Sequence, residues 1–381
     1  MRYYVIAGEA SGDLHGSNLI KEIKIIDNQA VVRCWGGELM QQAGGHLVKH
    51  YRDLAFMGFA EVIKNLPVIL RNMSFCKKDV REFSPDVLVL IDYPGFNLRI
   101  AKWARKNGIK TLYYISPQVW AWKQSRVRTI KKVVDKMIVI LPFEKEFYKR
   151  WNYKVEYVGH PLVEVVDQTA RTAKNDLQLV DANGNAAETQ PGEKIVALLP
   201  GSRKQEVQIK LPLMLQTANY FPDYSFIIAQ APSMSLHVYA EMIQQYPNVK
   251  VAVTGHTYSL LKQSSAALVT SGTATLETAL FGVPQVVCYK GSFLSYQIAK
   301  RLVKVKFISL VNLILDREVV KELIQDELTV ENVKKELNKI LNDDNVKARI
   351  LNDYEELKRL LKQDENASAK AAKELYVLAI S

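Results

Sequence analysis

The feature that most constrains the fold of this chain is an alternation of short apolar runs with amphipathic segments. The apolar runs are continuous, as expected for strands buried on both faces of a parallel sheet. Segments with helical periodicity separate many of them, which predicts doubly wound α/β units. The expected strands span residues 3–7, 31–35, 87–91, 111–115, 137–141, 155–158, 195–199, 225–229, 249–253, 267–269 and 285–289. The main expected helices span residues 14–26, 98–107, 211–220, 236–245, 258–264, 275–281, 333–341, 346–361 and 367–379.

A change in composition separates two α/β domains. Residues 166–194 are polar and contain Gly and Pro but few large apolar side chains, which is typical of a linker or a surface excursion. We therefore expect one α/β domain over 1–165 and a second over 195–349. A chain of 381 residues is long enough for two buried cores. Because open parallel sheets bind ligands beyond the carboxyl ends of their strands, two such domains facing each other would form a cleft there.

Charge and cysteine content limit the partners and the compartment. The net charge is +11, and the whole excess falls within residues 1–160, so the two halves are expected to meet different partners. The three cysteines are far apart and form no CxxC pair or Cys/His cluster. This argues against a disulfide framework or a zinc site and favours a reducing cytosol. They are Cys34, Cys76 and Cys288.

An apolar stretch with interleaved cations covers residues 54–78. Such a stretch suits a helix pair on an anionic bilayer, although a core helix with a solvated basic edge is the alternative. No run approaches the ~18 apolar residues of a membrane span, so any membrane contact would be peripheral. The basic half shows no zinc-finger, RNP-like or KH-like signature of nucleic-acid binding. The residues expected to face the membrane are Leu66, Val68, Ile69, Leu70 and Arg71.

Two motifs of the first half follow expected strands. The sequence GEASGD at 8–13 opens a helix, and its carboxylates Glu9 and Asp13 suit sugar hydroxyls better than a pyrophosphate. A plain strand-to-helix turn is the alternative. Asp92 ends the strand 87–91 at the place where a general base would stand, although it could instead cap the next helix.

Further along the first half, SPQVWAWK at 116–123 could form a sugar- or lipid-facing wall with its two tryptophans, or simply pack in the core. His160, between Gly159 and Pro161, stands at the expected hinge, where it could face the cleft or serve as a structural hinge residue.

Two motifs of the second half point together to a nucleotide diphosphate. In LPGSR at 199–203, Gly201 permits a close backbone approach and Arg203 offers a bidentate fork for phosphate. In SGTATLE at 271–277, backbone N–H groups and hydroxyls at a helix start could cradle a diphosphate, and Glu277 could accept hydrogen bonds from a ribose. A pair of capped helices is the alternative.

Taken together, these motifs resemble those of the lipid-A-disaccharide synthase family, inverting glycosyltransferases with the GT-B fold. They occur in the family's order and cover nearly the full chain. The most specific are GEASGD, SPQVWAWK and the block at 309–325. Two departures are visible: Gly95 stands where many members carry a second Asp, and Val311 replaces a common Pro. The other matches include IDYPGFN at 91–97, LPFE at 141–144, LPGSRxxE at 199–206 and SGTATLE at 271–277.

The resemblance implies a reaction between two acylated glucosamines. The donor would be UDP-2,3-diacylglucosamine and the acceptor 2,3-diacylglucosamine 1-phosphate, giving a β(1→6) disaccharide and UDP without a metal or other cofactor. The enzyme would work in the cytoplasm at the inner face of the cytoplasmic membrane, without nucleic acid. In GT-B folds a terminal helix often returns to the first domain, so 350–381 is expected to pack there. Another GT-B enzyme acting on a UDP-sugar, or a non-catalytic basic binding protein, remains the alternative.

The resemblance also assigns residues to roles. Asp92 would be the base. The donor would be bound by Ser202, Arg203, Glu206, Ser271, Gly272, Thr273, Ala274, Thr275 and Glu277, with Asn312 and Gln325 nearby. The candidates for the cleft and the acceptor are Glu9, Ser11, Asp13, Asn97, Trp120 and His160.

Overall fold

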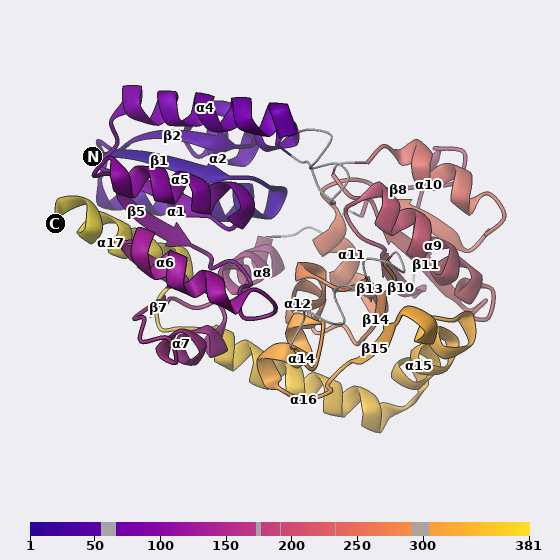
Figure 1. Cartoon of the computed structure of the whole chain (residues 1–381). Helices are drawn as coiled ribbons and strands as arrows, with labels where there is room; N and C mark the ends of the chain where they lie inside the picture. Colours follow the sequence, from indigo (N-terminus) through magenta and orange to yellow (C-terminus); the bar gives the residue numbers. More distant parts are fainter. Residues whose placement is uncertain (55–65, 173–176, 191, 233, 292–295, 297–304) are drawn as a thin grey trace. The chain divides into compact units, whose positions relative to one another are not determined.

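The chain forms two compact units in a computed structural model that describes residues 1–54, 66–172, 177–190, 192–232, 234–291, 296 and 305–381 (Figure 1). The first unit joins Met1–Pro161 to Leu361–Ser381, and the second is Leu162–Leu360. Residues 55–65 of the expected apolar stretch lie outside the described part of the chain. Among the described residues, no helix combines the length and the apolar character needed to cross a bilayer.

The first unit is built on a seven-stranded sheet in the order β3-β2-β1-β4-β5-β6-β7, with every pairing parallel. The six strands predicted for this half are confirmed. The sheet gains one edge strand that the sequence did not reveal, because β3 mixes polar with apolar residues and is only partly buried. The strands are β1 (Arg2–Ala7), β2 (Val31–Gly36), β3 (His46–His50), β4 (Val87–Ile91), β5 (Lys110–Tyr114), β6 (Lys136–Val139) and β7 (Glu156–Tyr157).

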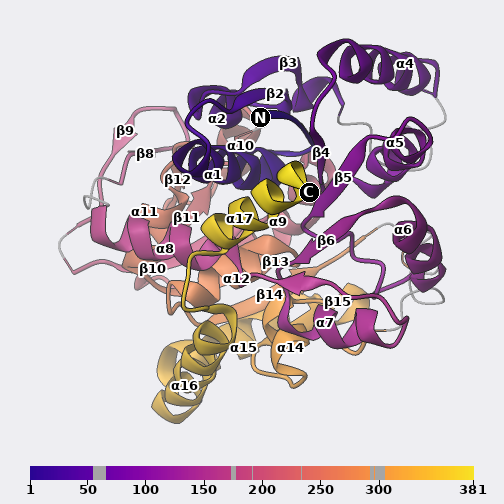
Figure 2. The same cartoon turned by 90° about the vertical axis from the view of Figure 1, so that its left-hand side faces the viewer.

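Helices cover both faces of this sheet. Figure 2 shows α1 and α17 on one face and α4, α5 and α6 on the other. The apolar sides of these helices pack on buried strand residues, which is the source of most of the stability of such a layer. The helices are α1 (Ala10–Ile26), α2 (Glu38–Gln42), α4 (Leu66–Phe83), α5 (Pro94–Lys106), α6 (Val127–Val133), α7 (Pro142–Lys149) and α17 (Ala367–Ile380).

The last helix, α17, packs against α1 in the first unit. Lys110 Nζ donates to the carbonyl of Leu378 (3.2 Å), and Lys370 Nζ donates to the carbonyl of Tyr157 (3.0 Å). The structure places 361–381 in this unit, whereas α16 (Asp344–Leu361) lies almost entirely in the second, so the returning segment is shorter than the expected 350–381.

The second unit contains an eight-stranded sheet in the order β15-β14-β13-β10-β11-β12-β8-β9. The five strands predicted for this half are confirmed, and their pairings are parallel. Three short strands are additional. The strands are β8 (Leu179–Val180), β9 (Ala186–Ala187), β10 (Lys194–Leu199), β11 (Tyr224–Ala229), β12 (Val249–Ala252), β13 (Ser264–Thr270), β14 (Gln285–Tyr289) and β15 (Lys321–Ile324).

The polar segment 166–194 differs from a simple linker. It contains the end of α8 (Pro161–Thr172) and a hairpin, β8–β9, that adds two antiparallel strands to the sheet edge. The carboxylate of Asp181 accepts the N–H groups of Asn183 (2.8 Å) and Asn185 (2.9 Å), which closes the turn. Strands of two residues are too short to show an apolar pattern, so the composition of this segment predicts a linker or a surface excursion and not a hairpin.

The remaining helices surround this second sheet. The helices predicted from periodicity in this half are present. They are α9 (Lys204–Ala218), α10 (Leu236–Ile243), α11 (Thr257–Gln263), α12 (Thr273–Leu280), α14 (Leu310–Leu315), α15 (Val330–Asn342) and α16.

Candidate functional site

Asp92 stands just beyond the carboxyl end of β4, on strained backbone. Asp92 and Tyr93 both adopt the left-handed conformation, with φ of 41° and 46°. The buried Asn97 amide holds this turn by donating to the carbonyls of Ile91 (3.1 Å) and Asp92 (2.9 Å), and the Tyr113 hydroxyl also donates to the Asp92 carbonyl. Strain of this kind costs roughly 1–3 kcal/mol per residue and clusters at functional sites.

The environment of Asp92 makes its carboxyl unusually basic. Burial raises its pKa to about 7, the negative charge of Glu9 contributes to the increase, and a hydrogen bond from the Tyr93 N–H opposes it. Glu9 and Asp92 come together because β1 and β4 are neighbours whose ends, Ala7 and Ile91, are paired. Gly8 permits this approach, since a Cβ there would lie 2.4 Å from the Tyr93 ring. A carboxyl that titrates near neutrality can accept a proton efficiently.

Two of the expected acceptor-side residues are committed to the fold. The buried carboxylate of Asp13 accepts the N–H groups of Gly37 (2.7 Å), Met40 (3.1 Å) and Leu39 (3.2 Å), so it satisfies the amino end of α2. The amide nitrogen of Asn97 is likewise occupied by strand-end carbonyls. Both residues hold the turns that carry Glu9 and Asp92, while the buried Oδ1 of Asn97 has no partner among the described residues. Their expected role toward the acceptor stays a prediction.

The two tryptophans of SPQVWAWK differ in exposure. Trp120 is buried and meets the Phe143 ring edge-on at 4.9 Å between centroids. Trp122 is 40% exposed, and Lys123 Nζ lies 4.4 Å from the centre of its ring. The expected sugar- or lipid-facing wall therefore fits Trp122, and Trp120 belongs to the core. Ser11 is exposed at the start of α1.

His160 is buried beside His15, with 6.5 Å between the ring centroids. Burial lowers the pKa of His15 to about 4 and, with a contribution from His15, that of His160 to about 3. Both rings are therefore neutral at neutral pH and packed inside the first unit. Glu144 of LPFE is a further buried group: burial raises its pKa to about 7, and it accepts the Leu141 N–H (3.0 Å).

In the second unit, LPGSR connects β10 to α9. Gly201 has φ of 123°, and a Cβ there would lie 2.3 Å from Glu206 Oε2, so glycine lets the Glu206 carboxylate fold back over the loop. Arg203 Nη1 forms an ion pair with Glu206 Oε1 at 3.2 Å. The Arg203 guanidinium and Ser202 are exposed, so the guanidinium can also meet an incoming anion.

The second donor motif follows β13, which pairs with β10. Ser271 Oγ donates to the Ile308 carbonyl (2.8 Å), and Thr275 Oγ1 donates to the Gly272 carbonyl (2.8 Å). These bonds shape the loop, while Gly272 and Thr273 stay exposed at the amino end of α12 and Ala274 is half-buried. Backbone N–H groups at a helix start favour an anion.

Glu277 lies one turn into α12 and accepts a hydrogen bond from the Tyr258 hydroxyl at 2.9 Å. Burial raises the pKa of Glu277. Sequence reasoning did not identify Tyr258, because nothing in its own segment distinguishes it from a core tyrosine.

Asn312 is held by hydrogen bonds on both sides of its amide. Its amide nitrogen donates to the Val320 carbonyl and to Glu322 Oε1 (both 2.9 Å), and its amide oxygen accepts the N–H groups of Val319 (2.8 Å) and Val320 (3.0 Å). These four bonds use the amide fully, so Asn312 supports the segment before β15. Gln325, by contrast, has φ of 55° and a buried Nε2 with no partner among the described residues.

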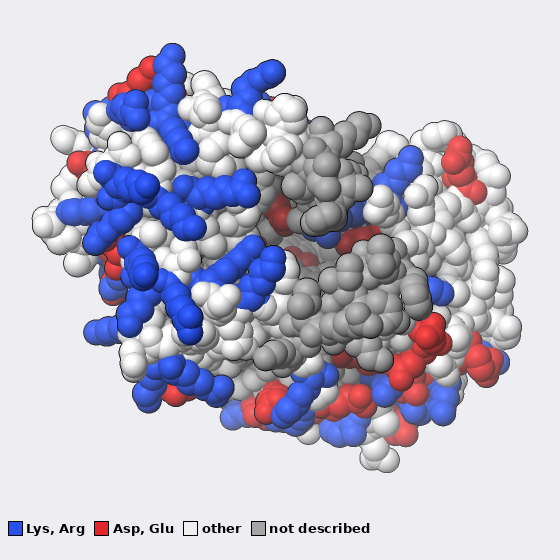
Figure 3. All heavy atoms as spheres, viewed as in Figure 1, with Lys and Arg blue, Asp and Glu red and all other residues white. Residues whose placement is uncertain are grey.

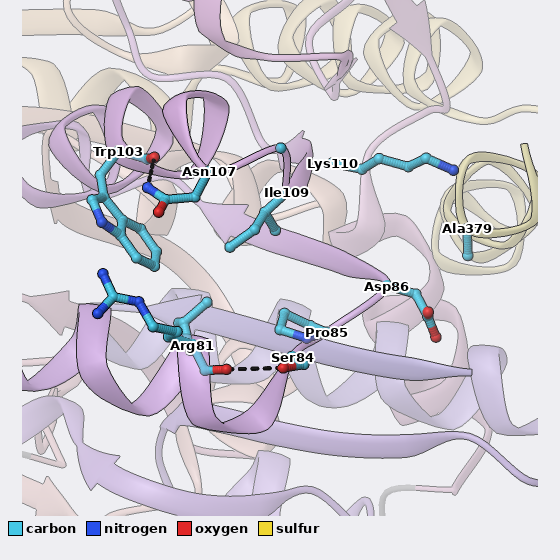
Figure 4. A pocket seen from close by; sticks show the side chains of 11 residues that line it. Arg81, Ser84, Pro85, Asp86, Trp103, Asn107, Ile109, Lys110 and Ala379 are labelled. Carbon is cyan, nitrogen blue, oxygen red and sulfur yellow. Dashed lines mark hydrogen bonds between the residues drawn. The ribbon is translucent and has the colours of Figure 1, made fainter.

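A separate groove of about 510 Å³ lies at the other end of the first sheet. Figure 4 shows Arg81 and Trp103 on one side of it and Lys110 and Ala379 on the other. Apart from Ala379 of α17, its residues come from the segments that lead into β4 and β5, so it lies at the amino ends of these strands, whereas Asp92 follows the carboxyl end of β4. The groove is therefore distinct from the candidate site.

Metal ligands are not gathered anywhere in the described ranges: no group of three or more His, Cys, Asp or Glu residues there could hold an ion. The three cysteines are free and buried.

The fold defines the class of protein first. The chain is similar over its whole length to the UDP-GlcNAc 2-epimerase of Neisseria meningitidis solved with UDP-GlcNAc (TM-score 0.66, 12% identity, covering 100% of both chains). It is similarly close to the glycosyltransferase of kitacinnamycin (TM-score 0.67, 14% identity, covering 99% of this chain and 98% of that one). Two doubly wound units of this kind make the GT-B fold.

Sequence similarity then identifies the family. The family model described as lipid-A-disaccharide synthetase matches residues 3–378. The lipid-A-disaccharide synthase of Geobacter sulfurreducens is 39% identical over 90% of this chain and 88% of its own length. That of Syntrophus aciditrophicus is 39% identical over 99% and 96%. The chain belongs to the lipid-A-disaccharide synthetase family.

Proposed function

We propose that this chain is the glycosyltransferase that condenses UDP-2,3-diacylglucosamine with 2,3-diacylglucosamine 1-phosphate, giving the β(1→6)-linked precursor of lipid A and UDP. The observation that carries the proposal is the family match over residues 3–378, which includes the motifs around Asp92 and Arg203. Fold similarity alone would also fit an epimerase, but the relatives that share 39% of their residues with the chain are named as synthases.

On the acceptor side, Asp92 is the general base. Its carboxylate takes the proton of the acceptor's 6-hydroxyl as that oxygen forms a bond to the anomeric carbon of the donor. The bond between that carbon and the diphosphate oxygen breaks in the same step, so the configuration inverts. A pKa of about 7 supports this role, because such a carboxylate is both ionised and basic near neutral pH.

On the donor side, Arg203 and the loop at 271–273 bind the diphosphate of UDP. Arg203 is exposed and offers a planar fork of donors, and the amino end of α12 supplies N–H groups and a positive dipole end. Both groups stabilise the negative charge that grows on UDP as it leaves. Glu277, held by Tyr258, accepts hydrogen bonds from the ribose, and the buried Nε2 of Gln325, which has no partner within the described part of the chain, supports a donor contact there.

The membrane surface is the second partner. Leu66, Val68 and Leu70 are exposed in the first turns of α4, Ile69 is half-buried, and Arg71 is exposed beside them. Figure 3 shows Lys and Arg side chains gathered over α4, α5 and α6 of the first unit. Exposed apolar residues next to cations support peripheral binding to the anionic inner face of the cytoplasmic membrane, where both acylated substrates would reside.

The substitution Asp92→Asn tests the role of the base. It should lower turnover by roughly 10²–10⁴-fold, because positioned proton transfer contributes that much, and it should leave UDP affinity unchanged. Release of UDP from UDP-diacylglucosamine measures turnover, and calorimetry measures UDP binding. Turnover within tenfold of the unmodified protein, with UDP binding intact, would remove Asp92 from this role.

The same assay distinguishes the reaction from its alternatives. Release of UDP that depends on the acylated acceptor is expected for a synthase. An epimerase would change the donor sugar without any acceptor, and a non-catalytic binding protein would release no UDP.

A further inference from the structure

Lys210, two turns into α9, is buried next to the donor loops. Only 2% of the residue is exposed, and lysine is seldom buried unless its ammonium is paired. Its Nζ donates to Thr270 Oγ1 and lies 4.0 Å from Glu206 Oε2. Nothing in the proposed mechanism uses this buried cation.

A line of alternating charge runs through Arg203, Glu206 and Lys210 at the start of α9. Glu206 and Lys210, four residues apart, lie next to each other on α9, and Arg203 immediately precedes that helix. One oxygen of Glu206 is paired with the exposed Arg203, and the other faces the buried Lys210. The carboxylate therefore sits between two cations.

Thr270 connects this line to the second donor loop. It is the last residue of β13, immediately before Ser271. A hydrogen bond from Lys210 to Thr270 thus joins the helix that follows LPGSR to the strand that leads into SGTATLE. The two loops proposed to bind the donor diphosphate share one buried cation.

We propose that Lys210 is a positioning residue for the diphosphate of the nucleotide donor: it neutralises Glu206 and links the two donor loops, so that Arg203 can offer its guanidinium to phosphate. This inference rests on the proposed function. Glu206, expected from the motif to contact the donor, acts in this arrangement through Arg203.

The physical reason is a competition for Arg203. Without Lys210, the full charge of Glu206 would hold Arg203 and repel the diphosphate. A buried ammonium is also costly: burial lowers the pKa of Lys210, an effect that Glu206 opposes. Replacing a whole buried ion pair by apolar side chains is often neutral or stabilising, whereas removing one partner alone is costly.

The test compares UDP binding by the full chain and three variants using calorimetry. Lys210→Met should weaken UDP binding by roughly three- to tenfold. Lys204→Met removes an exposed cation from the same helix and should change the affinity less than about twofold. In the Lys210→Met background, Glu206→Gln should restore affinity to within about twofold, because the amide still accepts from Arg203 without a charge. In turnover assays, KM for the donor should rise more than kcat falls.

Native-like affinity in Lys210→Met, or equal weakness in Lys210→Met and the double variant, overturns the inference. If Lys210→Met does not fold, Glu206→Gln alone decides: unchanged or tighter UDP binding supports the proposal, and binding weakened more than about threefold overturns it. Failure of the unmodified chain to bind UDP would instead overturn the proposed function, and this inference with it.

Discussion

The surroundings of Asp92 raise the pKa of an ordinary carboxyl to about 7. The largest cause is burial, and the second is the negative charge of Glu9 across the paired ends of β1 and β4. Hydrogen bonds from Asn97 and Tyr113 hold its backbone in a rare conformation, which fixes the position of the backbone that carries the carboxyl group. Each of these supports comes from a different element, so the site depends on the assembled sheet.

Glu9→Gln should move the acidic limb of the pH–rate profile to lower pH. Asp92 accepts a proton only when it is ionised, so turnover should rise with pH through its pKa of about 7. Removing the charge of Glu9 lowers that pKa, while burial keeps it above the value of an exposed Asp. The measurement is kcat/KM for the acceptor from about pH 5 to pH 9. Glu82→Gln, at an exposed site near the end of α4, is the control and should leave the limb in place. A limb that stays in place in Glu9→Gln would show that the two carboxyls are not coupled.

The helix α4 has two ends with different surroundings. Met73, Cys76 and Val80 are buried against the first sheet. Leu66 and Leu70, nearer the amino end, are 45% and 53% exposed. Packing in the core therefore explains the apolar residues in the carboxyl-terminal half of the helix. It does not explain the two leucines in the first turns.

Replacing Leu66 and Leu70 together by serine should weaken binding of the full chain to anionic lipid vesicles. Burial of a leucine side chain contributes about 1.5–3 kcal/mol, so losing two partly inserted leucines should reduce binding on the order of tenfold or more. The melting temperature should not fall, because both side chains are already exposed. Vesicle co-sedimentation measures the change, and high salt should weaken binding further by screening the nearby cations. Ile25→Ser, at a 75% exposed site on α1, is the matched control. Equal binding by the leucine variant and this control would place the membrane contact elsewhere.

At the scale of the whole molecule, the sequence predicts the two sheets well and the roles of polar residues less well. Continuous apolar runs such as Val87–Ile91 predict a buried strand, and the motifs that follow such strands are where the donor and acceptor sites are proposed. The edge strand His46–His50 lacks that signal. The structural hydrogen bonds of Asp13 and Asn312 cannot be predicted from residue type, because they involve backbone groups brought near only by folding. Lys210 was missed because its buried partner Thr270 is 60 residues away.

The return of 361–381 makes the first unit depend on the end of the chain. Leu375 of α17 is 1% exposed, so Leu375→Ala should lower the unfolding free energy of this unit by about 2–5 kcal/mol through the cavity it leaves. All five tryptophans lie in the first unit, so tryptophan fluorescence during urea unfolding follows it selectively. Val377→Ala, at a neighbouring position that is 58% exposed, should leave the midpoint unchanged. If both variants unfold at the same urea concentration as the unmodified chain, α17 contributes nothing to the first unit. A lower midpoint in Leu375→Ala alone would show that the packing of α17 stabilises the first unit.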